Sequence, residues 1–174
     1  MNAYRFSISW PRIIPDGLGP VNPAGIAHYR RFIADLKAAG IKPMLTLYHW
    51  DMPAALGAAG GWTNRQSVDW FKRYADVIFA NFADEIDLFC LINEPLIDCG
   101  FTLAARDRRG GSNAALELLP GGENLATTLK MLNHILLAAA AAKESFQARG
   151  HRGELGVALP LMPTLTENGA SATD

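Results

Sequence analysis

The chain has 174 residues, of which 49% are hydrophobic and 19% charged, and its formal net charge is −1. This composition is typical of a folded globular domain and excludes an intrinsically disordered chain. A chain with balanced charge has no basic field to attract phosphates, so we expect no nucleic-acid partner.

Cysteine usage and hydropathy bear on the compartment. Cys90 and Cys99 are nine residues apart, a spacing that fits neither a disulfide framework nor a CxxC metal or redox motif. We therefore expect a reducing, cytoplasmic location. The N-terminus has no signal-peptide pattern, and polar residues interrupt the apolar segment 129–142. A membrane span needs roughly 20 apolar residues, so we expect no membrane contact.

Short apolar and β-branched runs alternate with longer segments of helical periodicity. In chain order the pattern predicts a strand, then three helix and strand pairs, at 3–9, 24–39, 43–48, 65–83, 88–92, 125–149 and 155–161. Segment 88–92 is apolar in both alternating registers, as a strand covered on both faces requires. The order favours a single α/β domain, 1–174, with a parallel sheet.

Polar and aromatic side chains follow three of the predicted strands. They lie in Ser9-Trp10-Pro11-Arg12, His49-Trp50-Asp51 and Asn93-Glu94-Pro95. Because function gathers at the carboxyl ends of parallel strands, these residues predict a site on one rim of the sheet.

Glu94 is the first candidate, since apolar walls near a strand end disfavour the charged carboxylate, as a general acid requires. A solvated loop glutamate is the alternative. The Asn93 amide could hold a hydroxyl-rich ligand, and the rings of His49, Trp50 and Trp10 could contact sugars, although each could be structural. Arg5, on a predicted strand, needs a carboxylate or phosphate partner, or a structural ion pair. The four histidines lack metal-ligand spacing, so neither a metal nor a cofactor is expected.

Four segments of the sequence match a known family in order and spacing: YRFSISWPRIIPDGLGPVNPAGIAHY, KPMLTLYHWDMPAAL, GGWTNR and LINEP. They resemble the N-terminal third of the β-glucosidases of glycoside hydrolase family 1. The resemblance implies a (β/α)8 barrel that hydrolyses β-glycosides with retention, through two glutamates. By the same resemblance Glu94 matches the general acid/base, Asn93 the ligand of the sugar 2-hydroxyl, and His49 a glycone ligand. Arg5 matches the arginine that supports the nucleophile, and Trp50 falls beside the glycone site.

A complete barrel of this type needs about 250 residues, so the resemblance implies a partial barrel of family strands two to five. Glu167, in the tetrapeptide TENG, matches the motif of the family nucleophile. It lies 73 residues after Glu94, whereas the three intervening β/α units would need about 90. Glu167 is either a chance match or a working nucleophile.

An open half barrel exposes both edge strands and its interior, so we expect a second copy of the chain to close it as a homodimer. Two interpretations follow. The first is a β-glucosidase-like enzyme assembled from two half barrels and acting on β-glycosides. The second is an inactive fragment with at most weak sugar binding.

Overall fold

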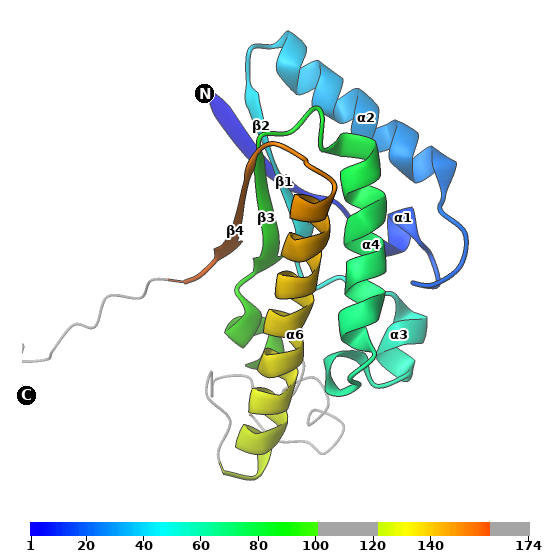
Figure 1. Cartoon of the computed structure of the whole chain (residues 1–174), viewed down its shortest axis with the longest axis vertical. Helices are drawn as coiled ribbons and strands as arrows, with labels where there is room; N and C mark the ends of the chain where they lie inside the picture. The colour runs from blue at the N-terminus through cyan, green and yellow to red at the C-terminus, as the bar shows by residue number, and fades with distance from the viewer. Residues whose placement is uncertain (101–121, 161–174) are drawn as a thin grey trace, which may run out of the picture.

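The computed structural model describes residues 1–100 and 122–160, and its centre is a parallel sheet. The strands follow the chain order, each hydrogen-bonded to the next. They are β1 (Ala3–Ser7), β2 (Lys42–Tyr48), β3 (Leu88–Asn93) and β4 (Glu154–Ala158), as Figure 1 shows. Four parallel strands with helical connections confirm the predicted α/β class and form part of a barrel.

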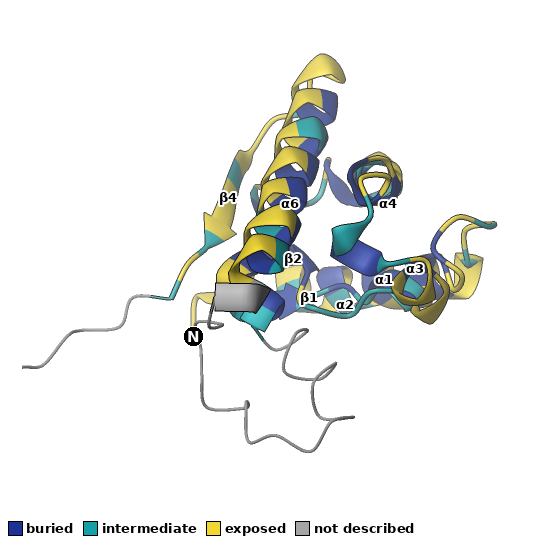
Figure 2. Cartoon of the chain, turned by 90° about the horizontal axis from the view of Figure 1, so that it is seen from below, coloured by how far each residue is buried: buried dark blue, intermediate teal, exposed yellow. Residues whose placement is uncertain are grey.

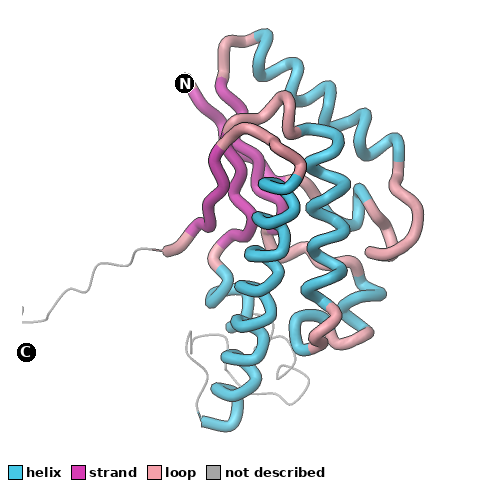
Figure 3. Tube along the Cα trace, viewed as in Figure 1, coloured by secondary structure: helices cyan, strands magenta, loops and turns pink. Residues whose placement is uncertain are grey.

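Three long helices connect these strands and cover one side of the sheet (Figure 3). They are α2 (Pro23–Ala38), α4 (Ser67–Phe82) and α6 (Gly122–Ala148). The side chain of Asn22 accepts a hydrogen bond from the backbone of Ala24 and caps α2, and Pro23 fits the first helical position. All three helices confirm predicted segments, within three residues at each end.

The main differences from the predicted elements are short helices at strand ends. They are α1 (Trp10–Ile13), α3 (Ala54–Ala58), the 3-10 turn η1 (Gly61–Thr63) and a helix over residues 95–100. β1 ends at Ser7 and not at residue 9, because Ser9 already occupies the N-cap position of α1. Helices as short as α1, α3 and η1 do not show an apolar periodicity in the sequence.

Aromatic side chains join the sheet to the helices. The Phe89 ring on β3 lies 5.6 Å from the ring of Phe79 on α4 and 5.7 Å from that of Phe146 on α6. On β1, Phe6 packs against Phe32 of α2. Because side chains alternate along a strand, Arg5 points to the opposite, concave face of the sheet.

The last strand and the outer side of α6 remain exposed, as the yellow segments of Figure 2 show. On β4, Val157 is 39% exposed, and three leucines of α6 are about half exposed: Leu125, Leu129 and Leu136. Their spacing places them on one face of the helix. The described structure therefore leaves an apolar surface open at the β4 end of the sheet.

One sequence expectation about membranes needs correction. Within the described ranges, Leu125–Ala148 is long and apolar enough to cross a membrane by length and composition, despite its polar residues. This is weak evidence, because the core helix of a soluble protein passes the same test, and α6 packs against α4. Cys90 and Cys99 are free and buried. The absence of membrane contact and the cytoplasmic location stay predictions.

Candidate active site

Arg5 connects three strands at the concave face. Its Nε donates to Thr46 Oγ1 of β2 at 2.8 Å, and its Nη2 donates to Asn93 Oδ1 of β3 at 2.6 Å. Nη2 also lies 3.6 Å from the Sγ of Cys90. In the described part of the chain these partners are neutral, and the expected carboxylate or phosphate partner stays a prediction. Arg5 is exposed, so little desolvation has to be offset there.

A register irregularity brings two residues of β3 to the same side. Cys90 and Asn93 are an odd number of positions apart and would face opposite sides of a regular strand. The pairing of β3 with β4 shifts between these two residues, and both then contact the Arg5 guanidinium. Irregularities of this kind re-aim side chains beside active sites. The sequence did not reveal the contacts of Thr46 and Cys90 with Arg5. These two residues are register partners on β2 and β3, and knowledge of this pairing would have placed them side by side.

His49 and Trp50 follow β2 and turn toward the neighbouring strand ends. His49 Nδ1 shares a hydrogen bond of 3.0 Å with the hydroxyl of Ser7, at the end of β1. The Trp50 indole donates to the backbone oxygen of Asn93 at 2.8 Å. His49 is exposed and Trp50 half-buried. The structure therefore brings Arg5, His49, Trp50 and Asn93 close together. The sequence predicted a common rim for the last three, but not for Arg5.

Glu94 lies at the same rim, directly after β3, in an unusual backbone conformation. Its φ is 43° and that of Trp50 is 79°, the two positive values among non-glycine residues of the described chain. Such conformations cost about 1–3 kcal/mol each and cluster at functional sites. The Glu94 amide donates to Ala158 O of β4 at 2.9 Å, which ties the residue to the next strand. Glu94 itself is half-buried.

Trp10 cannot offer a face to a sugar. It is fully buried, and its ring stacks on that of Tyr74 at 4.8 Å. Its backbone amide donates to Asp51 Oδ2 at 3.0 Å, which links the loops after β1 and β2. Burial raises the pKa of Asp51, although hydrogen bonds from Ser9 and from the Trp10 amide favour its charged form. Trp10 and Asp51 therefore have a structural role and hold together the segments that follow β1 and β2.

Two further sequence predictions concern a second carboxylate and the absence of a metal, and both stay predictions. Glu167 lies outside the described residues, so its role as a second carboxylate stays a prediction. Within the described ranges no three His, Cys, Asp or Glu side chains are grouped so that they could hold a metal ion.

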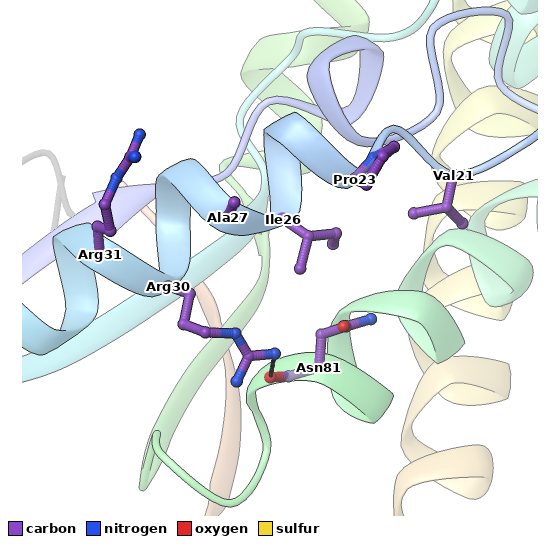
Figure 4. Close-up of a pocket in the computed structure, with 7 residues that line it drawn as sticks. All are labelled: Val21, Pro23, Ile26, Ala27, Arg30, Arg31 and Asn81. Carbon is purple, nitrogen blue, oxygen red and sulfur yellow. Dashed lines mark hydrogen bonds between the residues drawn. The ribbon is translucent and has the colours of Figure 1, made fainter.

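An apolar groove of about 550 Å³ lies elsewhere, on the outer helical layer between α2 and α4 (Figure 4). Val21 and Ile26 face it, whereas Arg31 points away. Arg30 crosses its end and donates to Asn81 O at 3.3 Å. The groove contains none of the residues at the strand ends and is separate from the candidate site.

Sequential parallel strands with outer helices, and polar side chains gathered at their carboxyl ends, define this molecule as part of an α/β barrel. The chain belongs to glycosyl hydrolase family 1, whose sequence profile matches residues 1–172. It is 56% identical over 175 residues to β-glucosidase A of Enterobacter agglomerans, covering 100% of this chain and 36% of that protein. It is 39% identical to β-glucosidase A of Thermotoga maritima, covering 90% of this chain and 33% of that protein.

The fold agrees with the sequence comparison. A solved structure of the Thermotoga maritima β-glucosidase in complex with noeuromycin superposes with a TM-score of 0.77 at 37% identity. The match covers 91% of this chain and 34% of that one. The chain thus spans about a third of the length of the relatives that it matches.

Proposed function

We propose that this chain supplies the acid/base side of a β-glucosidase-like site that hydrolyses β-glycosides with retention of configuration. Glu94 acts as general acid and then as general base, and Asn93 binds the sugar 2-hydroxyl. His49 and Trp50 contact the glycone, and Arg5 supports the nucleophile. The observation that carries the proposal is the Arg5–Asn93 hydrogen bond beside Glu94, at the carboxyl ends of parallel strands in a member of this family.

Retaining hydrolysis needs a second carboxyl group, about 5–5.5 Å from the first. Two carboxylates close to the strand ends in sequence already have partners: Asp51 accepts from the Trp10 amide and Asp98 accepts from Tyr48. We therefore look elsewhere for the nucleophile. Glu167 and Glu94 of a second copy are the two sources that we propose to test.

We further propose that a second copy closes the half barrel, with β4 of one subunit beside β1 of the other. The exposed β4 and the leucine face of α6 (Leu125, Leu129 and Leu136) support this, because both leave apolar surface that a parallel barrel would cover. Such an interface should bury at least roughly 1,000 Å². Light scattering tests the dimer, and a folded monomer at micromolar concentration would contradict it.

Hydrolysis of an aryl β-glucoside by the purified chain tests the activity. We expect the native chain to release the phenol, and Glu94→Gln to lower kcat by about 10²- to 10⁴-fold, the usual contribution of a general acid/base. Azide should restore part of the turnover of this variant, since the anion attacks the glycosyl-enzyme in place of water, needs no general base, and leaves as a glycosyl azide while the nucleophile is set free. Native and variant chains purified side by side control for a contaminating host glucosidase.

Glu167→Gln separates the sources of the nucleophile. Loss of turnover, with azide rescue of Glu94→Gln only while Glu167 is intact, supports Glu167 as nucleophile. Full activity of Glu167→Gln makes the TENG match a coincidence. If the native chain binds an iminosugar weakly and releases no phenol, the inactive-fragment interpretation replaces the proposed one.

A further inference from the structure

Three hydrogen bonds link four buried residues of four elements, two of them between side chains and one to a backbone carbonyl. Tyr48 of β2 donates to Asp98 Oδ2 at 3.1 Å, and the Trp62 indole donates to the Tyr48 hydroxyl at 3.0 Å. His134 Nδ1 of α6 lies 2.8 Å from Trp62 O. All four residues are at most 5% exposed.

The chemistry of the groups determines which atom donates in each of these hydrogen bonds. An indole N–H can only donate, so the Tyr48 oxygen must accept from Trp62, and its single hydrogen is left for Asp98. A carbonyl can only accept, so His134 Nδ1 donates to Trp62. Burial, with the nearby Asp98 charge, raises the pKa of Tyr48 well above its ordinary value of 10.0, which keeps the hydroxyl a donor.

Each end of the Tyr48–Asp98 bond is next to a candidate site residue. Tyr48 directly precedes His49. Asp98 lies one helical turn after Glu94, and its amide donates to Glu94 O at 3.1 Å. The bond therefore joins the strand end that carries His49 to the helix that begins after Glu94. Because the backbone of Glu94 is held at positive φ, surrounding contacts must stabilise it.

We propose that Asp98, held by the Tyr48 hydroxyl, is a positioning residue that fixes the place of Glu94 relative to His49 and Trp50. Asp98 itself does not touch the substrate. The effect on catalysis rests on the proposed function, whereas the effect on the Glu94 backbone does not. Sequence analysis missed this residue; a lone aspartate in the apolar run LIDCGF was the available signal.

Kinetics on two aryl glucosides give the first test. A phenyl glucoside needs a proton from the general acid, whereas a dinitrophenyl leaving group departs without one. Misplacing Glu94 in Asp98→Ala should lower kcat/KM on the phenyl glucoside by about 10- to 100-fold and kcat/KM on the dinitrophenyl glucoside much less, because kcat/KM reports only the first step, in which the leaving group departs. Asp98→Asn keeps an acceptor for Tyr48 and should recover most of the activity.

Tyr48→Phe removes the same bond from its other end. It also removes the acceptor of the Trp62 indole, so its kinetic defect should have the same direction as that of Asp98→Ala but need not equal it. The effects of the double variant should be less than additive, because the Tyr48–Asp98 bond is lost in all three variants. Ser145→Ala is the matched control. It removes another hydroxyl-to-carboxylate bond, from Ser145 to Asp76, which joins α6 to α4 at the far end of α6.

Hydrogen exchange of the Glu94 amide gives a readout that needs no activity. This amide donates to Ala158 O, so we expect Asp98→Ala and Tyr48→Phe to speed its exchange at least several-fold, and Ser145→Ala to leave it unchanged. An unchanged exchange rate of the Glu94 amide in these two variants, or an equal loss of kcat/KM on both glucosides, would overturn the positioning role. Faster exchange in a native background that releases no phenol would instead reject the proposed function and leave the positioning role standing.

Discussion

Arg5 and Asn93 are joined by a 2.6 Å hydrogen bond although 88 positions and one intervening strand separate them. A guanidinium has only donors, so the atom of Asn93 that faces Arg5 must be the amide oxygen. The amide nitrogen then points the other way, with two hydrogens to donate. Under the proposed function, Arg5 thereby presets Asn93 as a donor toward the sugar 2-hydroxyl.

Replacing Arg5 by Lys keeps the charge and removes the planar fork that reaches Thr46 and Asn93 together. We expect the free energy of unfolding to fall by about 1.5–3 kcal/mol, the usual range for hydrogen bonds to charged groups. Urea denaturation measures it. Thr46→Val, which removes the Nε bond alone, should cost less, and a Lys variant as stable as the native chain would show that the fork is not needed.

The left-handed backbone conformation of Glu94 predicts that glycine at this position gives a more stable protein than alanine, the reverse of the usual order. At most positions Ala is more stable than Gly, but at a φ of 43° a Cβ is unfavourable and glycine is not. Glu94→Gly should therefore be more stable than Glu94→Ala by roughly 1 kcal/mol. Thermal unfolding of the two variants decides this. If Ala proves the more stable, Glu94 does not hold this conformation in solution.

The contact between α4 and α6 should become weaker at acid pH, because Asp76 of α4 loses its charge there. Burial alone would raise the pKa of Asp76, but the hydrogen bond from Ser145 and the charges of Lys72 and Arg149 outweigh it and hold the pKa below 3.8. When the pKa is lower in the folded state, the charged group stabilises the fold at pH values above the pKa of the unfolded state. This stability is lost as the pH falls through the pKa of the folded state.

The stability gap between the native chain and Asp76→Asn should therefore be widest near neutral pH and should close as the pH falls below 3.8. Denaturant unfolding at several pH values measures this gap. Replacing the exposed Asp69 by Asn controls for the general loss of one charge. A gap that stays constant with pH would contradict the linkage.

Both cysteines should resist thiol reagents in the folded chain. Burial, together with the nearby Asp98 charge, raises the pKa of Cys99 to about 12, so the thiolate fraction at pH 8 is on the order of one in ten thousand. Cys90 is 1% exposed. We expect Ellman's reagent to titrate neither thiol before unfolding and both afterwards. Rapid reaction of the native chain would show that the segment after Glu94 opens readily.

The sequence predicted the long elements well and the short ones poorly, for a physical reason. The apolar stripe of α4 repeats over several turns, so its periodicity is unmistakable in Val68, Phe71, Ala75 and Ile78. Helix α1 has four residues and shows only Ser9 at its N-cap position and Pro11 near its start. Sequence analysis overlooked these start signals, and the predicted first strand was too long.

The same contrast holds at the candidate site. Residues at strand ends, such as His49 and Asn93, could be placed on one rim because parallel strands end together. The neutral partners of Arg5 and the role of Asp98 depend on register and on packing between distant segments, and the Cys90–Asn93 irregularity follows from no simple alternation. The second carboxylate stays a prediction.

The strand order β1-β2-β3-β4 has a consequence for how the molecule is made. Each strand pairs with the one synthesised just before it, so β1 and β2 can join as soon as Tyr48 has left the ribosome. Domains fold from the N-terminus as the nascent chain emerges, and here the direction of translation is also the direction in which the sheet grows. Each new strand can therefore pair with a strand that is already folded, and β4 forms one edge of the resulting sheet.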